Sequence, residues 1–263
     1  MKVVFHLFLV TTGCLFLFFL NGCGGGPEPV RVRVYAGAGL RPAMDELAQQ
    51  FEQESGIVCE IDYGGSGMII SRAKEDTDAD LFIPGDLWYV ERLHELTGII
   101  EEKRVVAYFV PVIIVQKGNP KKIKGIDDFV RSELQVALGN PEACQVGRIS
   151  MKILANAGID PDFIPAKSSL TVNELGLWVK MKDVDAAIVW DAIAANIADA
   201  VDTIEIPPEV NEISTVVAGL MKSSQHPEEA RKFVSFMRSP AGKTILSVKG
   251  YQTEPPKSDL ESP

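Results

Sequence analysis

The chain has 263 residues, of which 46% are hydrophobic and 24% charged, a composition typical of a globular protein. This length predicts one large domain or two lobes. The formal net charge of −10 and the lack of a basic stretch exclude a nucleic-acid-binding protein, because such proteins normally carry a basic face.

The N-terminal segment has the pattern of a bacterial lipoprotein signal peptide. Lys2 precedes an apolar run over residues 3–20, and Cys23 follows directly after the small residue Gly22. An uncleaved transmembrane anchor is the alternative, because a span needs roughly 20 apolar residues. We predict a signal peptide at 1–22, a lipid on Cys23, a tether at 23–30, and a location in the periplasm or on the outer face of the cytoplasmic membrane.

Two strand–loop–helix units follow the tether. Residues 30–35 alternate between apolar and polar side chains and predict a strand, and the apolar spacing of 42–54 predicts a helix. Residues 57–62 predict a second strand, and Met68 begins a second helix after the loop Tyr63-Gly64-Gly65-Ser66-Gly67. Three glycines and a serine leave the backbone of this loop uncovered, so the N–H groups at the helix start form a candidate anion site. A plain glycine-rich turn is the alternative.

A long apolar segment leads to the next unit of the same form. After a short strand at 79–83 and a helix at 88–96, residues 105–116 predict a strand that is broken at Pro111. A strand of this length can leave one lobe and enter another. The third unit then consists of a strand at 136–138, a loop at 139–147 and a helix at 148–157.

The remaining elements continue the alternation of strands and helices. We expect a helix from Thr171, a strand at 185–190, a helix at 192–200, strands at 204–206 and 213–220, and helices at 227–237 and 240–248. This order predicts an α/β fold of two lobes, each a mainly parallel sheet flanked by helices, with a ligand cleft beyond the carboxyl ends of the strands. The expected boundaries are 31–107 plus 212–255 for lobe 1, 108–211 for lobe 2 and 256–263 for a tail.

Six segments together resemble the periplasmic molybdate/tungstate-binding proteins of ABC importers. The segments are Val34–Leu40, Tyr63–Gly67, Ala79–Ile83, Gly139–Arg148, Ala187–Ala192 and Ser239–Tyr251. The resemblance covers about residues 31–251. It implies two lobes that close on a ligand, and delivery of that ligand to a permease in the membrane.

The resemblance also implies which residues bind the ligand. Ser66 matches a serine hydroxyl donor of the family, whereas Gly39 stands where a first such serine is expected. Backbone N–H donors fall on Val146, Gly147 and Val172, and Trp190 replaces a tyrosine. Tungstate-selective relatives carry acidic ligands where this chain has Cys144 and Val189, so an oxyanion held by hydrogen bonds, without a metal cation or cofactor, is implied.

Three further residues are candidates from their positions beside helix starts. Gly67 can offer its N–H group, and Arg41 and Arg148 can pair with an anion directly, although both arginines can equally be solvated. Gly39 lacks a hydroxyl, which predicts room for a larger anion or a bridging water. No disulfide is expected between Cys59 and Cys144.

Three functions are compatible with these patterns. The first is a monomeric, lipid-anchored receptor of an ABC importer for a small oxyanion, with molybdate or tungstate as the leading candidates. The second is the same receptor for a small organic anion, a carboxylate or a phosphoester. The third is a hydrolase that uses Ser66 or Cys144, and it is disfavoured because His94 and His226 are expected to lie away from the loops.

Overall fold

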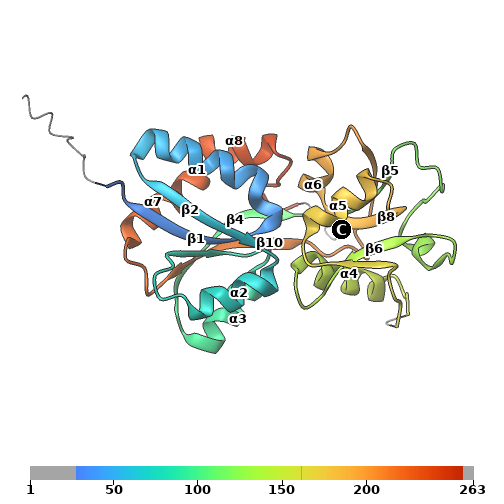
Figure 1. The fold of residues 1–263 in the computed structure, drawn as a ribbon, viewed down its shortest axis with the longest axis horizontal. Coiled ribbons are helices and arrows are strands. Elements are labelled where there is room, and N and C mark those ends of the chain that lie inside the picture. The colour runs from blue at the N-terminus through green and yellow to red at the C-terminus, as the bar shows by residue number, and fades with distance from the viewer. Residues whose placement is uncertain (1–27, 161, 257–263) are drawn as a thin grey trace, which may run out of the picture.

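The structure is a computed structural model that describes residues 28–160 and 162–256. The expected signal peptide, Cys23 and residues 257–263 lie outside the described residues. Two five-stranded sheets lie side by side along the long axis of the molecule, and each forms the centre of one lobe (Figure 1). Within the described part of the chain, every helix is too short or too polar to span a membrane.

The first lobe contains a sheet with the strand order β2-β1-β3-β10-β4. Strand β1 pairs in parallel with β2 and β3, and β10 is antiparallel to both of its neighbours. Helices α1, α7 and α8 pack on one another, and α2 and α3 lie on the opposite side of the sheet (Figure 1). The elements are β1 (Arg31–Gly37), the 3₁₀ helix η1 (Ala38–Leu40), α1 (Arg41–Ser55), β2 (Val58–Gly64), α2 (Ser66–Glu75), β3 (Leu81–Ile83), α3 (Leu87–Thr97), β4 (Ile100–Phe109), β10 (Ser214–Met221), α7 (Pro227–Met237) and α8 (Pro240–Val248).

The second lobe repeats this plan with the strand order β7-β6-β8-β5-β9. Strand β6 is parallel to β7 and β8, whereas β5 is antiparallel to β8 and β9. Helix α4 covers one face and helices α5 and α6 the other (Figure 1). The elements are β5 (Pro111–Gln116), the 3₁₀ helix η2 (Ile126–Val130), β6 (Val136–Gly139), α4 (Gln145–Asn156), β7 (Lys167–Ser169), α5 (Val172–Lys180), β8 (Ala186–Trp190), α6 (Asp191–Asn196) and β9 (Val201–Glu205).

The chain crosses between the lobes twice. Strand β4 ends at Phe109 in the first sheet and β5 begins at Pro111 in the second, which confirms the predicted strand that leaves one lobe for the other. The return crossing lies between β9 and β10. The first strand after each crossing, β5 or β10, is antiparallel to its neighbours, so both sheets are mixed.

The periodicities of the sequence correspond to the buried faces. In β1, Val32 and Val34 are buried between exposed Arg31 and Arg33, as expected of a strand with one covered face. The helical spacing in α1 buries Met44, Leu47 and Phe51 among other apolar residues. Two helices begin two or three residues earlier than the sequence predicts, α2 at Ser66 and α4 at Gln145, so their first turns lie inside the loops that were expected to precede them.

Candidate functional site

A small cavity lies where loops of both lobes meet. Its volume is about 20 Å³, somewhat more than the ~10–15 Å³ that a single water molecule requires. The first lobe contributes residues at or just after the ends of β1, β2, β3 and β4, and the second lobe contributes residues at or after the ends of β6, β7 and β8. The lining residues are Gly37, Ala38, Gly39, Gly64, Gly65, Ser66, Gly85, Phe109, Cys144, Gln145, Val146, Thr171, Val172 and Trp190.

Three α-helices point their N-termini at this cavity. Ser66, Val146 and Val172 lie in the first turns of α2, α4 and α5, where backbone N–H groups have no acceptor inside the helix. No side chain caps these three N-termini, whereas α3 and α8 are capped by the side chains of Asp86 and Ser239. The positive ends of three helix dipoles therefore converge with their N–H groups available to a ligand.

Ser66 provides a hydroxyl at the same point. Its side chain is buried, and Oγ accepts a hydrogen bond from the Gly85 N–H at 3.0 Å. A serine hydroxyl has one proton to donate, and here the bond from Gly85 uses only the oxygen. The hydroxyl proton is thus left for an acceptor in the cavity.

Gly39 and Trp190 lie against each other on opposite sides of the cleft. A Cβ atom on Gly39 would lie 3.0 Å from Cδ1 and 3.1 Å from Nε1 of Trp190. The indole ring is stacked on Phe109, with centroids 4.7 Å apart, and the Tyr251 hydroxyl donates to the Gly39 carbonyl at 2.6 Å. The expected extra room at Gly39 is therefore wrong, because the larger ring of Trp190 fills it.

Gly67 and Gly147 do not line the cavity. The Gly67 N–H donates to the Ala143 carbonyl across the cleft at 2.9 Å, and a Cβ on Gly67 would collide with the Glu142 carbonyl. A Cβ on Gly147 would collide with the Gly139 carbonyl, where α4 packs on β6. Both glycines are thus explained by close backbone approach in this conformation.

The two candidate arginines also lie outside the cavity lining. Arg41 lies over the Tyr63 ring, 4.1 Å from its centroid. Arg148 lies over the Trp88 ring, 4.4 Å from its centroid, with its guanidinium 3.8 Å from the Asp86 carboxylate. Because Arg148 belongs to the second lobe and the other two residues to the first, this cluster joins the lobes at the edge of the cleft.

Asp191 is turned toward the lobe crossing. Its carboxylate accepts hydrogen bonds from the Val110 and Ala192 N–H groups and from the Gln252 side chain. Burial raises the pKa of the Asp191 carboxyl above its ordinary value. The Asp191 carboxylate is therefore engaged by these three donors and does not line the cavity.

Gln145 is a site residue that the sequence patterns miss. It is buried in the cavity lining, where Nε2 donates to Ser214 Oγ at 3.1 Å and Oε1 accepts from Arg148 Nε at 3.2 Å. Ser214 begins β10 in the other lobe, so Gln145 bridges the cleft. No local signal could reveal this, because the partner is 69 positions away in the chain. Phe109 and Thr171 are also lining residues without a local signal.

The cavity has no charged lining residue among the residues that the structure describes. Burial raises the pKa of the Cys144 thiol to about 11, so this side chain is neutral at pH 7. Cys59 and Cys144 are both free. No group of three or more His, Cys, Asp or Glu residues in the described ranges is placed to hold a metal ion. What the arrangement offers chemically is a set of neutral hydrogen-bond donors.

Comparisons with known proteins agree on the kind of protein. A family described as bacterial extracellular solute-binding protein matches residues 32–252. A Haemophilus influenzae protein whose name specifies no ligand is 33% identical over 224 residues, covering 83% of this chain and 89% of the relative. The molybdate-binding protein ModA of Mycobacterium tuberculosis is 25% identical over 219 residues, 83% of each chain.

A solved structure gives the same result for the fold. The periplasmic molybdate-binding protein of Azotobacter vinelandii matches with a TM-score of 0.74 at 17% identity, over 86% of this chain and 100% of that chain. At this identity the likeness concerns the fold alone. It confirms the two-lobed periplasmic-binding-protein architecture that was expected from the sequence.

Proposed function

The chain belongs to the bacterial extracellular solute-binding protein family, and we propose that it is the receptor of an ABC importer for a compact tetrahedral oxyanion. Molybdate and tungstate are the leading candidates. The relative ModA, which is named as molybdate-binding, and the Azotobacter neighbour support this choice of ligand. The anion would be held in the cavity between the lobes.

The convergence of three uncapped helix N-termini carries this proposal. The donors available are the hydroxyl and N–H of Ser66, the N–H groups of Val146 and Val172, and the indole N–H of Trp190. Charge-assisted hydrogen bonds contribute about 1.5–3 kcal/mol each. Five of them contribute about 7.5–15 kcal/mol, which exceeds the ~8 kcal/mol of micromolar binding when the bonds are strong and the ordering and desolvation costs lie near the low end of roughly 4–15 kcal/mol.

The small size of the cavity disfavours an organic anion more than an inorganic one. A volume of about 20 Å³ is little more than one water molecule needs, so any anion requires some separation of the lobes, and a carbon skeleton beside the charged group requires more. Trp190 and Val172 also fill the space that a missing side chain at Gly39 was expected to leave. The carboxylate or phosphoester alternative therefore requires a more open arrangement of the lobes.

Binding is also better supported than hydrolysis. The Ser66 oxygen accepts from a backbone N–H, and no His, Asp or Glu among the described residues lines the cavity beside it. The raised pKa of Cys144 keeps this residue in the unreactive thiol form. Neither side chain thus has the general base that a nucleophile needs.

Titration calorimetry with molybdate, tungstate, sulfate and phosphate tests the proposal. We expect heat of binding with molybdate or tungstate, and about a 10- to 150-fold loss of affinity in Ser66→Ala from the loss of one charge-assisted bond. Ser71→Ala is the matched control, because Ser71 lies on the exposed face of the same helix. Absence of heat with all four anions would reject the oxyanion function.

The lipid anchor belongs to the same proposal. Lipid attachment at Cys23, in the sequence Leu20-Asn21-Gly22-Cys23, would place the receptor on the outer face of the membrane, close to its permease. We propose that it acts there as a monomer. Intact mass of the mature protein would show a chain that begins at a lipid-modified Cys23. A Cys23→Ala variant should then lack the lipid and keep residues 1–22, which intact mass would also show.

A further inference from the structure

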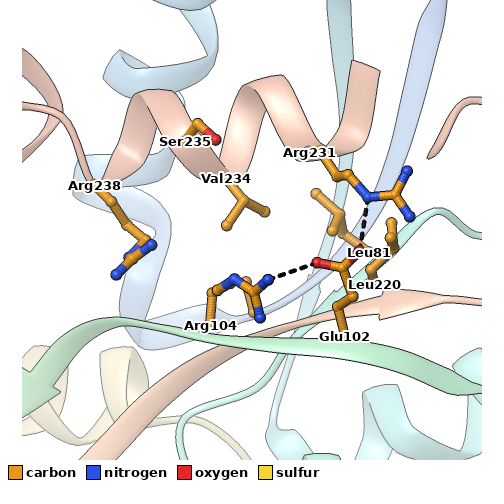
Figure 2. Close-up of a pocket in the computed structure, with 9 residues that line it drawn as sticks. Leu81, Glu102, Arg104, Leu220, Arg231, Val234, Ser235 and Arg238 are labelled. Atoms are coloured by element: carbon orange, nitrogen blue, oxygen red, sulfur yellow. Dashed lines mark hydrogen bonds and ion pairs between the residues drawn. The ribbon is translucent and has the colours of Figure 1, made fainter. Parts of the chain in front are cut away.

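A second cavity lies on the first lobe, between α7 and the strands β3, β10 and β4 (Figure 2). Its volume is about 150 Å³, a size that can hold a molecule of roughly the dimensions of benzene. It shares no lining residue with the cavity between the lobes. The lining residues are Leu81, Glu102, Arg104, Ala218, Leu220, Arg231, Val234, Ser235 and Arg238.

The arginines around this cavity differ in how many carboxylates they pair with. Arg231 is engaged by three carboxylates, those of Glu102 and Glu228 at 2.7 Å and that of Glu101 at 3.3 Å. Glu102 also accepts from Arg104 at 2.9 Å, so its own charge is balanced by guanidinium groups on two sides (Figure 2).

Arg238 has no such partner. Its guanidinium makes no ion pair or hydrogen bond with residues 28–160 or 162–256. Figure 2 shows the Arg238 side chain extending from the end of α7 toward β4, on the side of the cavity where Arg104 lies. Arg104 donates two hydrogen bonds, one to Glu102 and one to the Lys103 carbonyl. Since a guanidinium has five N–H donors, both Arg238 and Arg104 keep donors that no residue of the described chain accepts.

The floor of the cavity is apolar. Leu81, Ala218 and Leu220 project from β3 and β10, and Val234 projects from α7, and all four are buried. An apolar surface of this kind disfavours a fully hydrated inorganic anion, because the anion would lose water without compensation on that side. A ligand with a carboxylate head and a short apolar body satisfies both surfaces, since guanidinium groups match carboxylates in a bidentate geometry.

We propose that this cavity is a second ligand site, separate from the cleft, that binds a small carboxylate with an apolar body through Arg238 and Arg104. The carboxylate lies at the guanidinium side and the apolar body lies on Leu220 and Val234. Three of the lining residues are arginines and one is a glutamate, so the lining is positive although the chain has a net charge of −10; the carboxylates of Glu101 and Glu228, outside the lining, pair with Arg231.

Benzoate is the probe that tests this site, and benzyl alcohol is its neutral counterpart. In methyl NMR spectra of the wild-type protein, we expect benzoate to shift the signals of Leu220 and Val234 in a saturable way, and benzyl alcohol to bind more weakly. Arg238→Gln should weaken benzoate binding about tenfold through loss of a charge-assisted pair, and Arg104→Gln should weaken it by less.

Arg92→Gln is the matched control, because Arg92 is an exposed arginine on α3 that does not line the cavity. It should bind benzoate as the wild type does. The proposal is overturned if millimolar benzoate shifts neither Leu220 nor Val234, or if Arg238→Gln binds it with unchanged affinity. Because these readouts do not involve the cleft, they are independent of whether the protein binds molybdate.

Discussion

Trp190 and Gly39 show how two departures from a family pattern can compensate each other. The resemblance implies a serine near Gly39 and a tyrosine at Trp190. In the structure the larger indole occupies the space beside the smaller glycine, and Cδ1 of Trp190 lies 3.0 Å from the position of a Cβ on Gly39. The stacking of Trp190 on Phe109 and its burial restrict the ring from moving aside.

We therefore predict that Gly39→Ser alone does not improve binding. Overpacking typically costs about 1–3 kcal/mol, so the variant should have a lower melting temperature and weaker oxyanion binding. The double variant with Trp190→Tyr should recover most of both losses, because the smaller ring leaves room for the serine hydroxyl. Calorimetry and thermal unfolding measure the two effects, and a stronger anion affinity in Gly39→Ser alone would contradict this account.

At the scale of elements, the sequence predicts the helix starts that depend on residues nearby in the chain. The glycine-rich loop before α2 points to the helix start at Ser66, and the family resemblance implies Val146 at the start of α4; the structure brings both residues to one cavity. The positions of Gln145, Arg148 and Asp191 depend on partners far along the chain, such as Ser214 and Gln252. No local pattern contains that information, and the arginines expected beside an anion are instead packed on aromatic rings.

Helices α3 and α4 contact each other across the cleft through one cluster. Arg148 on α4 lies over the Trp88 ring on α3 and near Asp86, the N-cap of that helix. Burial raises the pKa of Asp86, and its hydrogen bonds and Arg148 oppose that shift. We infer that this cluster stabilises the closed arrangement of the lobes, and that its loss speeds opening.

Trp88→Ala should accelerate release of the bound anion. An exposed cation–π contact is worth about 0.5–1 kcal/mol, which corresponds to roughly a two- to fivefold faster dissociation rate. Stopped-flow measurement with the anion used in calorimetry gives this rate. Leu96→Ala is the control, because Leu96 is an exposed apolar residue on the same helix, and it should leave the rate unchanged. Equal rates in all three proteins would show that the cluster does not contribute to closure.

At the scale of the whole molecule, the structure is a closed form whose lobes are in direct backbone contact. The Gly67 N–H of the first lobe donates to the Ala143 carbonyl of the second at 2.9 Å. Gly65 is equally close, since a Cβ there would collide with the Ala143 and Leu170 carbonyls. The lack of a side chain on Gly65 and Gly67 therefore sets how closely the two lobes can approach, besides exposing N–H groups.

Gly67→Ala tests this directly. The new methyl group would collide with the Glu142 carbonyl of the other lobe, and the two crossings allow the collision to be relieved by separation of the lobes rather than by unfolding. We expect the variant without ligand to have a melting temperature within a few degrees of that of the wild type. It should bind the oxyanion at least about tenfold more weakly, through loss of a contact worth more than 1.4 kcal/mol. Its radius of gyration should not decrease when the anion is added. Small-angle X-ray scattering measures that decrease in the wild type.

Gly125→Ala is the matched control, because a Cβ on Gly125 meets no atom within 4 Å. If Gly67→Ala contracts and binds like the wild type, the lobes do not need this close approach, and the cavity described here is not the form that holds the anion.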